Sequence, residues 1–195
     1  MPTPAFTSFE GPLRLATRAD LPALQALIDA SMRALSAGFL SPEQVQAELA
    51  FVISPDTAMI DDGTLFVGVA PDDTIAGMGG WSRRRALHGG DAFKEAHAGE
   101  APNGLIDPRV EPARIRQMFT HPAWARRGVA RRLFEASRAA AEQEGFTRLI
   151  LTATLAGVPL YETLGFRIDR RYVDRLPNGI DVPVAEMSRG IRAAP

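Results

Sequence analysis

The 195-residue sequence has no cysteine and few aromatic residues, with two tryptophans and two tyrosines. The absence of cysteine excludes disulfides, thiolate catalysis and any zinc site with cysteine ligands. The three histidines, His88, His97 and His121, do not form a recognisable set of metal ligands. We therefore expect no disulfide and no metal site.

The sequence also lacks an excess of charge of either sign, because its net charge is −1. Broad binding to nucleic acids or to membrane surfaces requires a basic excess, so we expect neither partner. No apolar run approaches the ~18 residues needed to span a bilayer. The first residues do not place a basic region before an apolar core, as a signal peptide would. We expect a cytoplasmic protein that forms a single domain over residues 1–195.

The most informative stretch spans residues 114–166. Residues 114–120 are rich in β-forming types and predict a strand, which ends at Pro122 because proline has no N–H for a sheet ladder. An arginine-rich turn around Gly128 follows. Apolar residues then return at the spacing of a helix: Val129, Leu133, Ala136 and Ala140. The order is therefore strand, basic turn, helix.

This order favours an anion site at the start of the helix. The first amide groups of a helix have no intrahelical partner, and the helix dipole adds partial positive charge there. Gly128 permits a ligand to approach the backbone closely. The turn also supplies planar guanidinium donors that suit phosphate oxygens: Arg126, Arg127, Arg131 and Arg132. By spacing alone, a solvated basic helix start is an equally good interpretation.

Two later segments favour the anion site. Residues 149–154 predict a strand, and residues 158–166 predict a short helix that ends at Gly165. Together these segments resemble the GCN5-related N-acetyltransferase (GNAT) superfamily over about fifty residues. The first signature of that family binds acyl-CoA and has the form Gln/Arg-x-x-Gly-x-Gly/Ala. It is matched here as Ala125-x-x-Gly128-x-Ala130, with Ala125 where the family usually has Gln or Arg.

The second signature of the family is an Asn followed by Tyr and then by Gly-Phe. It is matched here as Thr154, Tyr161 and Gly165-Phe166, with Thr154 in place of the Asn. The resemblance implies an α/β (α+β) fold of the GNAT type. We expect a mixed, mainly antiparallel, twisted sheet with helices on both faces. The strands that end at Thr120 and Thr154 would run parallel and splay apart at the centre of the sheet.

The resemblance also implies an activity. An acyl-CoA-dependent N-acyltransferase of this kind uses acetyl-CoA as cosubstrate and transfers the acetyl group directly to an amine of a small molecule or peptide. A non-catalytic acyl-CoA-binding sensor is the alternative. A nucleotide-binding P-loop is disfavoured, because no Gly-Lys-Ser/Thr follows the glycine of the turn. The final hairpin of the family often dimerises, so a homodimer is possible.

Site roles follow from the same resemblance. Tyr161 matches the proton donor to the leaving thiolate, since a phenol is protonated at neutral pH. The residues expected to bind the cofactor are Met118, Phe119, Thr120, Arg126, Arg127, Gly128, Val129, Ala130, Arg131, Thr154 and Tyr161. Trp81 and Arg83 are expected to contact the acceptor. No general base is assigned. His121 is better explained as the cap of a loop, and Asp91, Asp107 and Glu111 are better explained as solvated surface residues.

The amino-terminal part predicts an irregular arm over residues 1–12, a strand at 13–16 and two helices. Asp20 is the expected N-cap of the first helix. Ser41-Pro42-Glu43-Gln44 is a capping box that begins the second, which ends before Pro55. Between the helices, Phe39 and Leu40 are better explained by packing than by a role in the acceptor pocket.

Two hairpins and one long connection complete the expected architecture. Residues 64–69 and 74–81 predict a hairpin whose glycines at 77, 79 and 80 indicate close approach by substrate or a helix, or a bulge. Residues 82–113 form a long insert, which is a substrate-side flap, a dimer contact or a disordered segment. Residues 167–173 and 182–187 predict a final hairpin through Asn178-Gly179.

Overall fold

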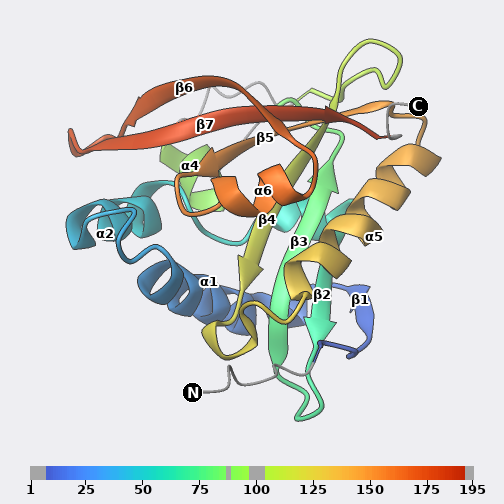
Figure 1. The fold of residues 1–195 in the computed structure, drawn as a ribbon, viewed down its shortest axis with the longest axis horizontal. Coiled ribbons are helices and arrows are strands. Elements are labelled where there is room, and N and C mark those ends of the chain that lie inside the picture. Colours follow the sequence, from blue (N-terminus) through green and yellow to red (C-terminus); the bar gives the residue numbers. More distant parts are fainter. Residues whose placement is uncertain (1–7, 87–88, 97–103, 192–195) are drawn as a thin grey trace.

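The computed structural model describes residues 8–86, 89–96 and 104–191, and its centre is one seven-stranded sheet (Figure 1). The strand order is β1-β2-β3-β4-β5-β7-β6, and every neighbouring pair is antiparallel except β4 and β5. The strands are β1 (Leu13–Leu15), β2 (Leu65–Val69), β3 (Ile75–Ser82), β4 (Ala113–Thr120), β5 (Arg148–Thr154), β6 (Arg167–Arg175) and β7 (Asp181–Gly190). This arrangement confirms the expected mixed, mainly antiparallel sheet.

Helices cover both faces of the sheet, as expected. They are α1 (Leu21–Leu35), α2 (Pro42–Phe51), α3 (Thr57–Asp61), α4 (Asp91–Ala96), α5 (Val129–Gln143) and α6 (Val158–Thr163). One large apolar cluster joins α1 and α2 to the sheet, and another joins α5 and α6 to the opposite side (Figure 1). Because side chains alternate along each strand, both faces need an apolar layer. No helix in the described segments is long and apolar enough to cross a membrane.

The start of α1 differs from the expectation in one detail. Asp20 directly precedes the helix, but its side chain does not cap it. The carboxylate instead accepts a hydrogen bond from the amide of Thr17 at 2.7 Å and pairs with Arg14 at 2.8 Å. A short 3₁₀ turn, Arg18–Asp20, therefore precedes α1, and Asp20 closes the capping box of that turn. The capping box of α2 is present as expected, with the Ser41 hydroxyl accepting from the Gln44 amide at 3.2 Å.

Two glycines of β3 are explained by close packing against α5 and β4. A Cβ at Gly77 would lie 2.6 Å from Val129 Cγ1 of α5. A Cβ at Gly79 would lie 2.2 Å from Met118 Sδ of β4. The pairing of β3 with β4 also shifts register between Met78 and Gly80. Close packing and a bulge therefore act together, and they bring α5 against the sheet beside β4.

The described residues of the long insert contact the rest of the chain, and residues 87–88 and 97–103 lie outside the described segments. Arg84 pairs with Asp62 at 2.7 Å and forms an isolated bridge with Leu105. In α4, Lys94 contacts both Asp56 and Asp91. The described part of the insert is thus attached to the segment that follows α2.

Candidate functional site

The central strands β4 and β5 separate along their length. They pair at only two positions, Ala113 with Leu149 and Arg114 with Ile150, and the rest of each strand has no sheet partner on that side among the described residues. Gln117 in β4 has a φ of 59°, which is rare for a residue with a side chain. This residue coincides with the register shift against β3, and a bulge of this kind bends a strand. The expected splay between the two parallel strands is confirmed.

The turn after β4 leaves helix amides exposed to a ligand. Arg126 and Gly128 both have left-handed backbone conformations, with φ of 63° and 86°, and α5 begins at Val129. No side chain caps the helix, and no acidic residue lies in its first turn. A Cβ built at Gly128 would meet no atom within 4 Å. The helix start therefore offers unpaired amide donors and positive dipole charge in an open position.

The arginines around this turn have different surroundings. Arg132 donates to the carbonyl oxygens of Phe9 at 3.1 Å and Gly11 at 2.7 Å, so it holds the amino-terminal arm. The Phe9 amide in turn donates to the Arg127 carbonyl at 2.8 Å. The Arg127 guanidinium lies over the Trp124 ring, 5.0 Å from its centroid. Arg126 and Arg131 are exposed beside the helix start.

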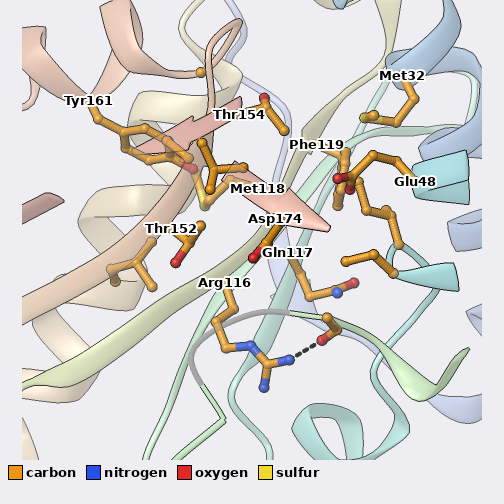
Figure 2. A pocket seen from close by; sticks show the side chains of 17 residues that line it. Met32, Glu48, Arg116, Gln117, Met118, Phe119, Thr152, Thr154, Tyr161 and Asp174 are labelled. Atoms are coloured by element: carbon orange, nitrogen blue, oxygen red, sulfur yellow. Dashed lines mark hydrogen bonds between the residues drawn. The ribbon is translucent and has the colours of Figure 1, made fainter. Parts of the chain in front are cut away.

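A cavity of about 140 Å³ lies where β4 and β5 diverge. It is lined by β4 residues 115–119, β5 residues 152–154 and residues from other elements, which include four side chains labelled in Figure 2. Those side chains are Met32 of α1, Glu48 of α2, Tyr161 of α6 and Asp174 of β6. Of the residues expected to bind a cofactor, four line this cavity: Met118, Phe119, Thr154 and Tyr161.

Tyr161 lies on one side of the cavity and Glu48 on the other (Figure 2). The Tyr161 ring is 8% exposed and packs edge-on against Phe166 at 5.7 Å between centroids. Burial raises the pKa of the Tyr161 phenol, so this group stays protonated well above neutral pH. The phenol can therefore donate a hydrogen bond into the cavity.

Glu48 and Asp174 were not found from the sequence. Burial, and after it the charge of Asp174, raises the pKa of Glu48 to about 7. A signal for Glu48 was present, because it lies three residues after Val45 and four before Val52 on the apolar stripe of α2. An acidic residue on a core-facing stripe indicates a special environment. Asp174 gave no such signal, since it occupies an ordinary position in a hairpin strand.

A buried ion pair borders the cavity. The Arg116 guanidinium lies 2.9 Å from the Asp56 carboxylate, and both side chains are nearly inaccessible, at 3% and 1% exposed. Arg116 also donates a hydrogen bond to the carbonyl of Gly89, drawn as a dashed line in Figure 2. Gln117 donates to the Ser54 carbonyl at 3.1 Å. These contacts tie β4 to the insert and to the segment after α2.

The predicted acceptor contacts lie away from the cavity. Trp81 is 2% exposed and packs against Phe146, 5.7 Å between ring centroids. Arg83 lies over the Trp81 ring and pairs with Glu144 of α5's C-terminal end at 3.4 Å. Neither residue lines the cavity, so the structure gives no support to an acceptor role for them. The alternation of strand residues explains this, because Trp81 points to the face covered by α5.

Other candidates also have structural partners outside the cavity. The Nδ1 atom of His121 accepts a hydrogen bond from the Ala123 amide at 3.2 Å, which caps the 3₁₀ turn Pro122–Trp124. Asp107 pairs with Arg109, and Glu111 pairs with Arg85 at 2.9 Å. Phe39 is exposed and Leu40 is buried in the core, and neither lines the cavity. Within the described residues, no group of three acidic or histidine side chains could hold a metal ion.

Comparisons with known proteins agree with this geometry. The model of an acetyltransferase (GNAT) domain matches residues 37–181. No curated protein matches. A GCN5-related N-acetyltransferase from Rhodopseudomonas palustris superimposes with a TM-score of 0.67 and 18% identity, covering 95% of this chain and 99% of that one.

Two further solved structures contain the coenzyme. The PaiA N-acetyltransferase from Thermoplasma acidophilum, in complex with coenzyme A, has a TM-score of 0.59 and 13% identity, covering 92% and 98% of the two chains. YncA, a putative acetyltransferase from Salmonella typhimurium with its cofactor acetyl-CoA, has a TM-score of 0.58 and 16% identity, covering 94% and 96%. At these identities the likeness concerns the fold.

The splayed strands and the uncapped helix beside them give the chain the fold of these solved acetyltransferases. The match over residues 37–181 then shows that the chain belongs to the GNAT acetyltransferase family. It is accordingly an N-acetyltransferase.

Proposed function

We propose that the chain transfers an acetyl group from acetyl-CoA directly to an amine of a small molecule or peptide. The observation that carries this proposal is the gap between β4 and β5, which opens beside the uncapped start of α5 and leads to the cavity with Tyr161. One ligand with a diphosphate and an extended arm would use all three features.

The described residues fit coenzyme A. The diphosphate would accept hydrogen bonds from the amides at the helix start, at Arg126, Arg127, Gly128, Val129, Ala130 and Arg131. The left-handed Gly128, with open space where a Cβ would be, leaves room for it. The extended arm would pair with the free side of β4 through backbone groups of Met118 and Thr120. Phe119 would pack beside the arm, and Thr154 would face it from β5.

Acetyl-CoA supplies a thioester carbonyl for attack by the amine and a thiolate leaving group. A backbone amide near Thr120 would stabilise the oxyanion formed on attack. The phenol of Tyr161 would donate a hydrogen bond to the sulfur as negative charge develops there. Because burial raises the pKa of Tyr161 further above that of a thiol, complete proton transfer to the sulfur is unfavourable for this group alone. We therefore propose that Tyr161 keeps its proton on Oη and stabilises the sulfur by donating a hydrogen bond to it.

The experiment that tests the proposal measures coenzyme A binding and acetyl-CoA-dependent thiol release with a panel of primary amines. The Tyr161→Phe variant should bind coenzyme A within a few-fold of the parent and lose roughly 10²-fold in kcat. Tyr172→Phe is the matched control, because the other tyrosine of the chain does not line the cavity. It should keep the parental kcat.

Two outcomes would oppose the proposal. Coenzyme A binding without turnover of any amine, together with indifference to Tyr161→Phe, would indicate an acyl-CoA-binding sensor. Binding of ATP in preference to coenzyme A would indicate a nucleotide site. A cytoplasmic location and a homodimer through the β6–β7 hairpin stay predictions, and the dimer is tested by sedimentation equilibrium.

A further inference from the structure

Two carboxylates from distant parts of the sequence face the same cavity. Glu48 comes from α2 and Asp174 from β6. Among the described residues that line the cavity, Arg116 is the only lysine or arginine, and its charge is balanced by the buried Asp56. Two further acidic side chains, Glu48 and Asp174, therefore line the cavity beside this balanced pair.

Glu48 is a buried polar side chain that lacks a partner within the described residues. Its exposed fraction is 3%, and its carboxylate makes no hydrogen bond or ion pair with them. The side chain lies at the edge of the cavity beside Phe119 (Figure 2). Burying a carboxylate without a partner is costly, and a ligand that carries positive charge would supply one.

The rest of the lining suits an aliphatic amine. Met32, Val52 and Ile53 form an apolar wall close to Glu48 in the fold. The acceptor oxygens beside this wall are those of the Glu48 and Asp174 carboxylates. The cavity thus presents acceptor oxygens above apolar surface, which matches an ammonium group on a hydrocarbon chain.

We propose that Glu48 and Asp174 bind the acceptor as a cation, and that the acceptor is an aliphatic amine without an anionic group near its amine. This inference rests on the proposed acetyl transfer, because it identifies the acceptor of that reaction. It excludes free amino acids and other amines that carry a carboxylate or phosphate, since the anion would face two acidic side chains.

The same geometry gives Glu48 a role in the proton balance. Its carboxylate takes one proton from the bound ammonium, and the freed lone pair forms the C–N bond as the C–S bond breaks. The second proton leaves the nitrogen for the departing sulfur, and Glu48 then releases its proton to solvent. The titratable groups that line the cavity together with Glu48 are Asp174 from β6, Tyr161 from α6 and Arg116 from β4. With a pKa of about 7, Glu48 is an effective base near neutral pH.

A series of three acceptors of similar length tests the inference. Butylamine, 1,4-diaminobutane and 4-aminobutanoate differ in the charge of the group remote from the reacting amine. At pH 8 we expect kcat/KM to be highest for the diamine and at least 10-fold lower for 4-aminobutanoate than for butylamine. Equal or better use of 4-aminobutanoate would overturn the inference.

Variants add a readout that is specific to the two carboxylates. Asp174→Asn should reduce the discrimination against 4-aminobutanoate at least several-fold. Glu48→Gln should lower kcat/KM for butylamine roughly 10²-fold and remove the limb of its pH profile near pH 7. Glu43→Gln is the matched control, because it lies on the same helix but is exposed and outside this cavity. An unchanged pH profile in Glu48→Gln would refute the role of Glu48.

Failure of the inference and failure of the proposed function are distinguishable. NMR titration of the three amines into the protein measures acceptor binding without any turnover. If coenzyme A does not bind, the proposed function fails, while preferential binding of 1,4-diaminobutane still supports the acidic subsite. If coenzyme A binds and amines are acetylated without preference for cations, only the inference fails.

Discussion

At the scale of single residues, Glu48 makes the stability of the protein depend on pH. Its pKa rises from 4.5 in the unfolded chain to about 7 in the folded one, so the folded state binds the proton more tightly. Glu48 therefore favours the folded state fully below pH 4.5, and this contribution is lost as the pH rises through 7. The loss is about 3 kcal/mol, at 1.36 kcal/mol per pKa unit.

The first prediction follows from this sign. Glu48→Gln should be more stable than the parent at pH 8, by roughly 1–3 kcal/mol, and close to it at pH 5. Urea unfolding at both pH values measures the difference. A variant that loses stability at pH 8 would show that Glu48 has a favourable partner in the folded protein.

The buried pair of Arg116 and Asp56 leads to a second prediction. Arg116→Met should destabilise the protein by roughly 3–5 kcal/mol, because it removes a charged partner from the buried Asp56 carboxylate and leaves Lys94 and the Ala58 amide. The midpoint of urea unfolding measures this loss. Arg18→Gln is the control: Arg18 pairs with Asp61 at the surface, at 61% and 50% side-chain exposure, and its midpoint should not move. Equal unfolding midpoints for both variants would show that burial of the Arg116–Asp56 pair does not increase the stability lost when the arginine is removed.

At the scale of elements, the role of the α5 start in binding coenzyme A can be tested by comparing two glycines. Gly128 and Gly179 both have left-handed backbone, with φ of 86° and 81°, and neither has an atom within 4 Å of a built Cβ. Alanine at either position should cost roughly 1–2 kcal/mol of stability. Only Gly128→Ala should also weaken coenzyme A binding, by about 10-fold, because it shifts the amides that face the ligand. Calorimetry separates the two variants, and similar affinities would argue against the helix start as the diphosphate site.

Much of this element-level arrangement could be predicted from the sequence. Local sequence signals predict the order of strand, arginine-rich turn and helix, because Pro122 stops β4 and Gly128 permits the left-handed turn. Ser41 in the same way predicts the start of α2. Such signals act within a few residues, so one sequence is sufficient to recognise them. The short helices α3 and α4 lack comparable periodicity and were not expected.

The contents of the cavity could not be predicted in the same way. Gln117 has a positive φ although nothing in its local sequence requires it, because the bulge depends on how β4 meets β3 and β5. Asp174 reaches the cavity through the pairing of β6 with β7 and of β7 with β5, which joins segments far apart in the sequence. The predicted contacts Trp81 and Arg83 were placed by their position in the chain, and the strand turns Trp81 towards α5. Long-range packing decides each of these.

At the scale of the whole molecule, ligand binding should raise thermal stability. A ligand that binds only the folded state adds about 2.7 kcal/mol at 100 times its Kd. For a chain of this size that corresponds to a rise of roughly 5–10 °C in Tm. Thermal unfolding with acetyl-CoA, and with ATP at the same concentration as the control, measures the effect. A rise with ATP that equals the rise with acetyl-CoA would contradict selective binding of the coenzyme.

Only two pairs of residues join β4 to β5, so the sheet consists of a four-stranded part and a three-stranded part that are connected at one end of this seam. Beyond these two pairs, the described residues of β4 and β5 do not pair with each other across the seam. A thioester arm lying there would act as a temporary extra strand, so the sheet would be continuous during catalysis and interrupted after product leaves. Slow deuterium uptake along both edges in the presence of coenzyme A, and fast uptake without it, would be the signature of a sheet completed by its own cosubstrate.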